Sequence, residues 1–216
     1  LDEVAIYRKA LSPERFQMRV PFFPKPSSPP MPQSAPPRGD VLVEVIEGIP
    51  DQATWPVTFP EATESWKEPA FAFFGTPQRY SSKGLRIDRG NPLILQASSL
   101  MTLPAGKYNF LVRTLRFGRL FIDGKLVVET PQRGHRGGGH GQMYELKSTL
   151  APGSRELFPG AIERIAEVQL DGKEHEFQFE VHAGGQERRI EFGETSVSFA
   201  PVTESSNDAD SQVADD

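Results

Sequence analysis

The stretch RTLRFGRLFIDGKLVVETP, residues 113–131, decides the fold class of this chain of 216 residues. Apolar and polar residues alternate on both sides of Asp123-Gly124, and an Asp-Gly dipeptide in that setting favours a tight hairpin turn. We therefore predict that residues 119–122 and 125–129 form a β-hairpin. The turn alone explains Asp123, because aspartate tolerates the backbone geometry of such a turn and caps it.

Further short strands are predicted along residues 40–200. Residues 41–46, 70–74 and 92–97 are apolar runs of strand length, and the run at 70–74 (AFAFF) is expected to be a buried strand. Residues 107–115 (KYNFLVRTL) alternate in polarity, as expected of an antiparallel strand with one solvated face.

A second hairpin is predicted later in the chain. The segments AEVQL (166–170) and EHEFQFEV (174–181) flank a turn at Asp171-Gly172. One face of the later segment is expected to be apolar and directed inward, and the other polar and solvated. These faces hold Phe177, Phe179 and Val181 on the inner side, and Glu176, Gln178 and Glu180 on the outer side.

The end of the domain completes a β pattern. Residues 195–199 (TSVSF) are predicted to close the domain, with Val197 and Phe199 directed inward. Helical evidence is limited to a turn or two within residues 155–167, where Pro159 interrupts the pattern. Many short strands separated by turn signals predict an all-β fold, an antiparallel β-sandwich.

The composition excludes several classes of function. A net charge of -5 does not suit a nucleic-acid partner, and no apolar run is long enough for insertion into a membrane. The absence of cysteine excludes disulfides and cysteine nucleophiles. No serine-hydrolase elbow or zinc-protease motif is present, so we expect no catalytic residues, no cofactor and no enzyme activity in this segment.

Two segments of biased composition flank the predicted domain. Residues 21–39 hold eight prolines, which favours an extended spacer between domains over a ligand for a proline-binding domain. Residues 201–216 hold five acidic residues and no Lys or Arg, and they predict a disordered acidic tail without the ligand spacing of a calcium loop. The main domain is therefore assigned to residues 40–200.

The first twenty residues, LDEVAIYRKALSPERFQMRV, predict a strand and a short helix that begins at Ser12-Pro13. One strand and one short helix cannot bury a core alone, so residues 1–20 are expected to end a domain whose body lies upstream. The segment resembles the closing strand and helix of laminin-G-like, concanavalin-type jelly rolls in bacterial surface proteins.

Two other segments carry a second resemblance. Residues 103–130 (LPAGKYNFLVRTLRFGRLFIDGKLVVET) and 170–192 (LDGKEHEFQFEVHAGGQERRIEF) resemble two hairpins of the protective-antigen-like β-sandwich, the PA-fourteen domain. This resemblance implies a β-sandwich that often binds carbohydrate and is attached to exported proteins. The combination of modules is similar to large exported bacterial proteins that also carry cytochrome c-like domains, which implies an extracytoplasmic location.

The chain departs from the sugar-binding members of that family at one point. In those members a pair of aspartates before the segment RLFIDG holds a calcium ion that binds sugar hydroxyls. Leu115 and Arg116 stand at those positions here. A leucine cannot coordinate the ion and an arginine repels it, so a calcium-dependent mechanism is not expected and no metal site is predicted.

The best local candidate for a site is the segment TPQRGHRGGGHGQMYEL, residues 130–146. Its histidines suit a metal, while its glycines and arginines suit an anion, and a non-binding glycine loop remains an alternative. Aromatic residues before and after the run at 70–74 form another candidate, because exposed rings stack on sugars whereas buried rings only fill a core. These aromatic residues are Trp55, Phe59, Trp66 and Tyr80.

Two histidines of the second predicted hairpin, His175 and His182, are predicted to have partly exposed structural roles.

The functional hypothesis is a non-catalytic, calcium-independent module that binds carbohydrate or another cell-surface polymer. The alternative is a spacer that docks against neighbouring domains of the same chain. The predicted ligand-binding residues are Trp66, Arg116, Arg133, His135, Arg136 and His140.

Overall fold

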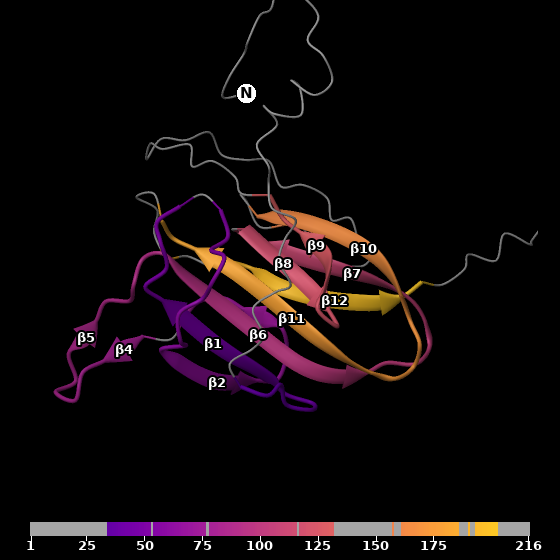
Figure 1. Ribbon diagram of the computed structural model, residues 1–216, viewed down its shortest axis with the longest axis horizontal. Helices are drawn as coiled ribbons and strands as arrows, with labels where there is room; N and C mark the ends of the chain where they lie inside the picture. The colour runs from indigo at the N-terminus through magenta and orange to yellow at the C-terminus, as the bar shows by residue number, and fades with distance from the viewer. Residues whose placement is uncertain are drawn as a thin grey trace, which may run out of the picture.

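The computed structural model describes residues 34–52, 54–76, 78–115, 117–131, 157, 161–185, 190 and 193–202. The strands of these residues form two main antiparallel sheets that pack face to face, and a two-stranded sheet stands out from one side (Figure 1). The predicted all-β antiparallel sandwich is confirmed.

The larger sheet has six strands in the order β2-β1-β6-β11-β8-β9. Their bounds are β2 (Glu64–Glu68), β1 (Val41–Glu47), β6 (Leu93–Thr102), β11 (Glu174–Ala183), β8 (Phe117–Ile122) and β9 (Lys125–Glu129). The smaller sheet contains β10 (Ile162–Leu170), β7 (Gly106–Thr114), β12 (Thr195–Pro201) and β3 (Ala72–Phe73), in that order. The separate pair is β4 (Arg79–Tyr80) and β5 (Arg86–Ile87).

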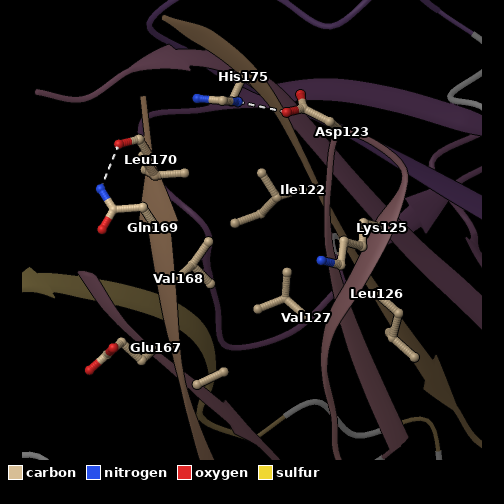
Figure 2. Close-up of a pocket in the computed structure, with 11 residues that line it drawn as sticks. Ile122, Asp123, Lys125, Leu126, Val127, Glu167, Val168, Gln169, Leu170 and His175 are labelled. Carbon is tan, nitrogen blue, oxygen red and sulfur yellow. Dashed lines mark hydrogen bonds and ion pairs between the residues drawn. The ribbon is translucent and has the colours of Figure 1, made fainter. Parts of the chain in front are cut away.

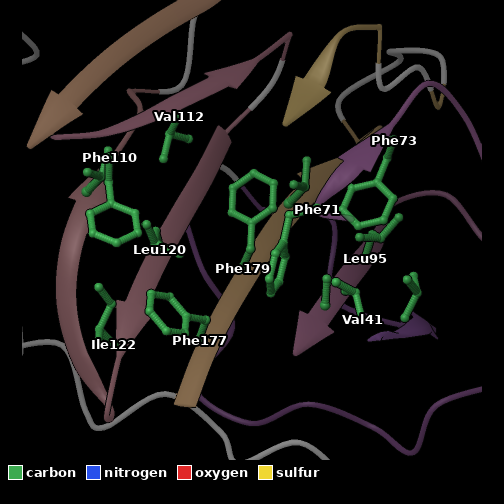
Figure 3. Packing of buried hydrophobic residues seen from close by; sticks show 14 of the residues in the cluster. Val41, Phe71, Phe73, Leu95, Phe110, Val112, Leu120, Ile122, Phe177 and Phe179 are labelled. Carbon is green, nitrogen blue, oxygen red and sulfur yellow. The ribbon is translucent and has the colours of Figure 1, made fainter. Parts of the chain in front are cut away.

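The core lies between the two main sheets and is rich in phenylalanine (Figure 3). Phe177, Phe179 and Val181 of β11 face it, as the alternation predicted. Phe110 of β7 meets Phe177 across the interface with ring centroids 5.7 Å apart. Aromatic pairs at this spacing add attraction beyond their buried area.

The first predicted hairpin is present as β8 and β9. Both turn residues have positive φ, 49° at Asp123 and 71° at Gly124, as a tight two-residue hairpin turn requires. The register shifts between Leu120 and Phe121, so that Leu120 pairs with Val128 and Phe121 pairs with Leu126. Val127 is therefore the extra residue of a β-bulge.

The second predicted hairpin is wrong. β10 pairs with β7 in the smaller sheet, whereas β11 pairs with β6 and β8 in the larger sheet. The turn at Asp171-Gly172 thus carries the chain from one sheet to the other. The turn signal was correct, but a turn residue fixes only the local reversal and not the partner of each strand.

Three smaller expectations also need correction. The run at 70–74 is not buried throughout, because Phe71 and Phe73 enter the core while Phe74 is 81% exposed. Phe199 is directed inward as predicted, with its ring 5.7 Å from that of Phe110, but it remains 42% exposed because β3 pairs with Thr195 and Ser196 and does not cover the later part of β12. The weak helical pattern within residues 155–167 is overridden from Ile162 onward, where the chain belongs to β10.

The outer face of the larger sheet is buried rather than solvated. Residues from the connection between β1 and β2 pack on Ile46 and Ile94 of this face; they are Ile49, Trp55, Phe59 and Ala62. Gln178, Glu180 and His182, which were expected to meet solvent, are buried. The alternating pattern of β11 correctly predicted which face of the sheet each residue occupies. It did not predict that other residues cover the outer face.

A polar row crosses this buried face in register. Glu44, Gln96, Glu180 and Arg119 are successive cross-strand partners on β1, β6, β11 and β8. Glu180 is fully buried and accepts hydrogen bonds from Gln96 Nε2 (2.9 Å), Gln178 Nε2 (2.7 Å) and Arg119 Nε (2.5 Å). A buried carboxylate needs such partners to offset its lost hydration.

Trp55 covers the end of this row. The guanidinium carbon of Arg119 lies 4.0 Å from the centroid of the Trp55 ring, and Trp55 Nε1 donates to Glu129 Oε1 at 3.2 Å. The same ring stacks on Phe117 at 4.7 Å and meets the edge of His182 at 6.0 Å. The cation–π contact and the ion pair together hold Arg119 in place.

Replacing Glu180 with leucine is expected to destabilise the domain by about 3–5 kcal/mol, because Arg119 would stay buried without its carboxylate. The double variant Glu180→Leu/Arg119→Met should lose much less than the sum of the two single variants. Urea unfolding of the four proteins in the cycle measures the coupling. Glu174→Leu on the same strand is the matched control, since it breaks only the exposed pair with Arg38 and should change little. Additive effects of the two core substitutions would contradict the expectation.

Candidate functional site

A groove of about 590 Å³ lies between the β8–β9 hairpin and β10 (Figure 2). β9 is the last strand of the larger sheet and β10 is the last strand of the smaller sheet. Among the strands that the structure describes, β9 and β10 each have a neighbour on only one side, and the groove runs between them along one side of the sandwich. Strands of different sheets form its two walls, and β10 lies far from the hairpin in the sequence.

The floor of the groove is aliphatic. Ile122, Val127 and Val168 point toward one another between the hairpin and β10 (Figure 2). The bulge explains why Val127 contributes: Val128 is in the core, Val127 is also packed against the core, and strict alternation would place only one of the two on that side. The further apolar lining comes from Leu126, Ala166 and Leu170.

The rim of the groove is polar and charged. Asp123, Lys125 and His175 lie on the side of the larger sheet, and Glu167 and Gln169 lie on β10. Glu167 forms an ion pair with Lys107 of β7, with 3.0 Å between Oε1 and Nζ. An aliphatic floor with a few polar groups at its rim is a usual composition of a binding site for a small polar ligand.

His175 links the two turns at one end of the groove. Its Nδ1 lies 2.6 Å from Asp123 Oδ2, and its Nε2 lies 3.0 Å from Asp171 Oδ1. A carboxylate only accepts hydrogen bonds, so His175 can donate to both aspartates at once only when its ring is protonated. The turn of the larger sheet and the turn that crosses between the sheets are thus joined through one ring.

The electrostatics agree with this assignment. The hydrogen bond to Asp123 raises the pKa of His175, and the charges of Asp123 and Asp171 act in the same direction. Hydrogen bonds from Lys173 lower the pKa of Asp171 to about 2. Asp123 also accepts a hydrogen bond from the backbone N–H of Glu176 at 2.9 Å.

Sequence reasoning missed this cluster. It explained Asp123 by its turn and gave His175 an unspecified structural role, although both turns share the dipeptide Asp-Gly. That repetition was the available signal. It does not reveal that the two turns are adjacent, because their proximity depends on the chain changing sheets at Asp171-Gly172.

Most of the predicted ligand-binding residues lie outside the described part of the chain. These are Arg116, Arg133, His135, Arg136 and His140. Described residues near Arg116 are bonded to Thr130, the first residue of the segment 130–146. Thr114 Oγ1 lies 3.0 Å from Thr130 Oγ1, and the same Thr130 hydroxyl accepts a hydrogen bond from Gly118 N at 2.8 Å. The residues that flank Arg116 thus meet the residue that precedes the Gly-rich segment.

The expected absence of a calcium pair can be examined at Leu115. A Cβ atom placed on Gly193 would lie 2.9 Å from Leu115 Cδ2, so the leucine side chain packs closely on the backbone before β12. Among the described residues, no group of three or more His, Asp or Glu side chains is arranged to hold a metal ion.

The aromatic candidates have different environments. Trp66 on β2 is partly buried against the core, and its Nε1 donates to Glu68 Oε1 at 2.8 Å. Trp55 lies on Arg119, and Phe59 packs against the apolar residues of the outer face. Tyr80 on β4 is the most exposed of the four candidates.

Comparison with known proteins finds no matching family model and no matching curated protein. Solved structures do match. The PA14 domain of the MpAFP antifreeze protein is similar over 80% of this chain and 88% of its own length, with 11% identity and a TM-score of 0.49. The PA14 sugar-binding domain from an RTX adhesin is similar over 76% and 90%, with 13% identity and a TM-score of 0.46.

A third match is a beta-glucosidase from Kluyveromyces marxianus, solved in complex with glucose. The similarity covers 76% of this chain but only 16% of the enzyme, with 11% identity and a TM-score of 0.45.

Within the described residues of the present chain, no helix combines the length and apolar character that a membrane span would need.

Replacing Gly118 with alanine is expected to destabilise the domain by about 1–3 kcal/mol, the usual cost of overpacking a buried site. The new Cβ would lie 2.7 Å from Thr114 Cγ2 and 3.4 Å from the Glu180 carbonyl oxygen. Gly106→Ala on β7 is the control, because its Cβ would meet only Tyr108 Cε2 at 3.9 Å. Denaturant unfolding should show no loss for that control, since alanine suits a strand better than glycine. Equal losses in both variants would contradict the assignment.

The His175 link is expected to give a stability that depends on pH. A pKa raised in the folded state means that the contribution is fully present below the unfolded value, about pH 6.5, and is lost as the pH rises through the folded value. The Tm difference between the wild type and His175→Gln should therefore be largest near pH 6 and should shrink toward about pH 9. Thermal unfolding of both proteins at matched ionic strength gives this difference directly, and a constant difference would show that the ring is neutral.

Proposed function

We propose that this sandwich is a non-catalytic binding module for carbohydrate or another cell-surface polymer, and that it works without calcium. The observation that carries the proposal is the groove between β9 and β10. Among the described residues it lies between the two outermost strands of different sheets, where a polymer could be held without the need for a free chain end. Its dimensions are within the range usual for sites of small ligands.

The chemistry of the groove suits a sugar. A pyranose ring presents apolar C–H groups on its faces and hydroxyl groups at its periphery. The aliphatic side chains of Ile122, Val127 and Val168 offer contact to the apolar faces, and the Lys125 ammonium, which is directed into the groove (Figure 2), can donate hydrogen bonds to the hydroxyl groups. The resemblance of residues 103–130 and 170–192 to the PA-fourteen domain supports the same class of ligand.

The segments around Arg116 and residues 133–141 remain a second proposed contact surface. Their support is the bonded cluster of Thr114, Gly118 and Thr130, which holds the residues beside both segments together. The proposed calcium independence rests on Leu115, an apolar residue that offers no oxygen ligand to a calcium ion. The sequence resemblance to exported proteins supports a location outside the cytoplasm.

A polysaccharide binding screen on the whole chain, with and without a chelator, tests the proposal. Binding should persist in the chelator, and Val168→Phe, which fills the groove, should weaken it by about tenfold or more, or about 1.4 kcal/mol. Ile165→Phe is the matched control, because it introduces the same side chain at an exposed residue of β10 that does not line the groove.

The outcomes separate the alternatives. Loss of binding in Arg116→Ala or on deletion of residues 133–141, with Val168→Phe unaffected, would move the site to those segments. Binding that requires calcium would contradict the proposed mechanism. No binding to any polysaccharide would contradict the function, and a spacer that docks on neighbouring domains would then be the better explanation.

A further inference from the structure

We propose that the groove selects anionic polysaccharides, polymers that carry sugar carboxylates or sulfates, and that Lys125 is the residue that contacts the anion. This inference rests on the proposed function, because it names the class of polymer that the same groove binds. It is carried by the position of one side chain and by the balance of charge around the groove.

The strand register directs Lys125 into the groove. Lys125 is the direct cross-strand partner of Ile122, and partners in an antiparallel pair project to the same face. Ile122 belongs to the floor of the groove, so its partner Lys125 lies on the groove side of β9. Figure 2 shows the Lys125 ammonium directed toward the space between the hairpin and β10.

The acidic groups of the rim are already neutralised. Asp123 is paired with His175, and Glu167 is paired with Lys107. Asp171, at the same end, is paired with both His175 and Lys173. When His175 is protonated, the two aspartates, the imidazolium and Lys173 sum to zero charge, and Glu167 and Lys107 also balance each other.

Lys125 is left as the uncompensated charge of the groove. It forms no ion pair with any residue that the structure describes. An ammonium group is a compact positive charge with three donors, which suits a carboxylate or sulfate oxygen. Because it stands beside an aliphatic floor, it can bind the anionic substituent of a sugar whose ring lies on Ile122 and Val168.

The net charge of the chain opposes the binding of an anionic polymer. The net charge of -5 repels a polyanion at long range, so attraction to one must come from a local site. The contribution of one exposed lysine is modest and is screened by salt. The expected signature is therefore a preference among polymers, with a dependence on ionic strength, rather than a very high affinity.

Affinity electrophoresis of the whole chain in gels that contain polygalacturonate, dextran sulfate or neutral dextran tests the inference. The wild type should be retarded by one or both anionic polymers, and Lys125→Ala should weaken that binding about fivefold, as loss of an exposed charge contact predicts. Lys125→Arg keeps the charge and should retain most of the binding. Lys67→Ala is the matched control, because Lys67 is an exposed lysine of β2 outside the groove.

Every outcome bears on the inference. Retardation by polygalacturonate alone identifies a carboxylated polymer, and retardation by dextran sulfate alone identifies a sulfated one. Equal losses in Lys125→Ala and Lys67→Ala would show unspecific attraction and overturn the inference. Binding of neutral polysaccharides only would overturn it while leaving the proposed function standing, whereas no binding of any polysaccharide would overturn both.

Discussion

The fold depends on one buried ion pair, the contact between Glu180 and Arg119 on the outer face of the larger sheet. Glu180 is fully buried, and its two oxygens are satisfied by side chains from β6, from β8 and from its own strand. A shift of β11 by one residue against either neighbour would bury this carboxylate among groups that cannot neutralise it. The ion pair therefore fixes the register of the strands that carry both the core and the hairpin.

This constraint reaches the groove through the hairpin. Arg119 and Ile122 lie on the same strand, β8. The contact that fixes the position of Arg119 therefore also fixes the positions of Ile122 and its cross-strand partner Lys125 along the groove. The bulge then turns Val127 toward the same space. A polar contact on one face of the sheet thus determines the arrangement of an aliphatic floor on its other side.

The sequence predicted the parts of the fold that depend on local pattern. The hairpin at Asp123-Gly124 and the inner face of β11 were correct, because turn geometry and alternation are properties of adjacent residues. The pairing of β10 with β7 could not be derived in this way, since it depends on which sheet offers a complementary edge. The prediction that Glu180 lies on a solvated face was wrong for a related reason. Alternation separates the two faces of a strand, but it does not show that Trp55 covers one of them.

The candidate site was even less accessible to the sequence, because it is made by strands that do not follow one another. Its two walls are sheet edges, which expose unpaired backbone groups and favour aggregation unless they are protected. β9 is short and bulged, and β10 carries Arg164 and Glu167 among its apolar residues. The same features that prevent another strand from adding at these edges leave the space between them open. The open side of the sandwich can therefore admit a polymer that makes side-chain contacts, while it disfavours a peptide that would extend either sheet.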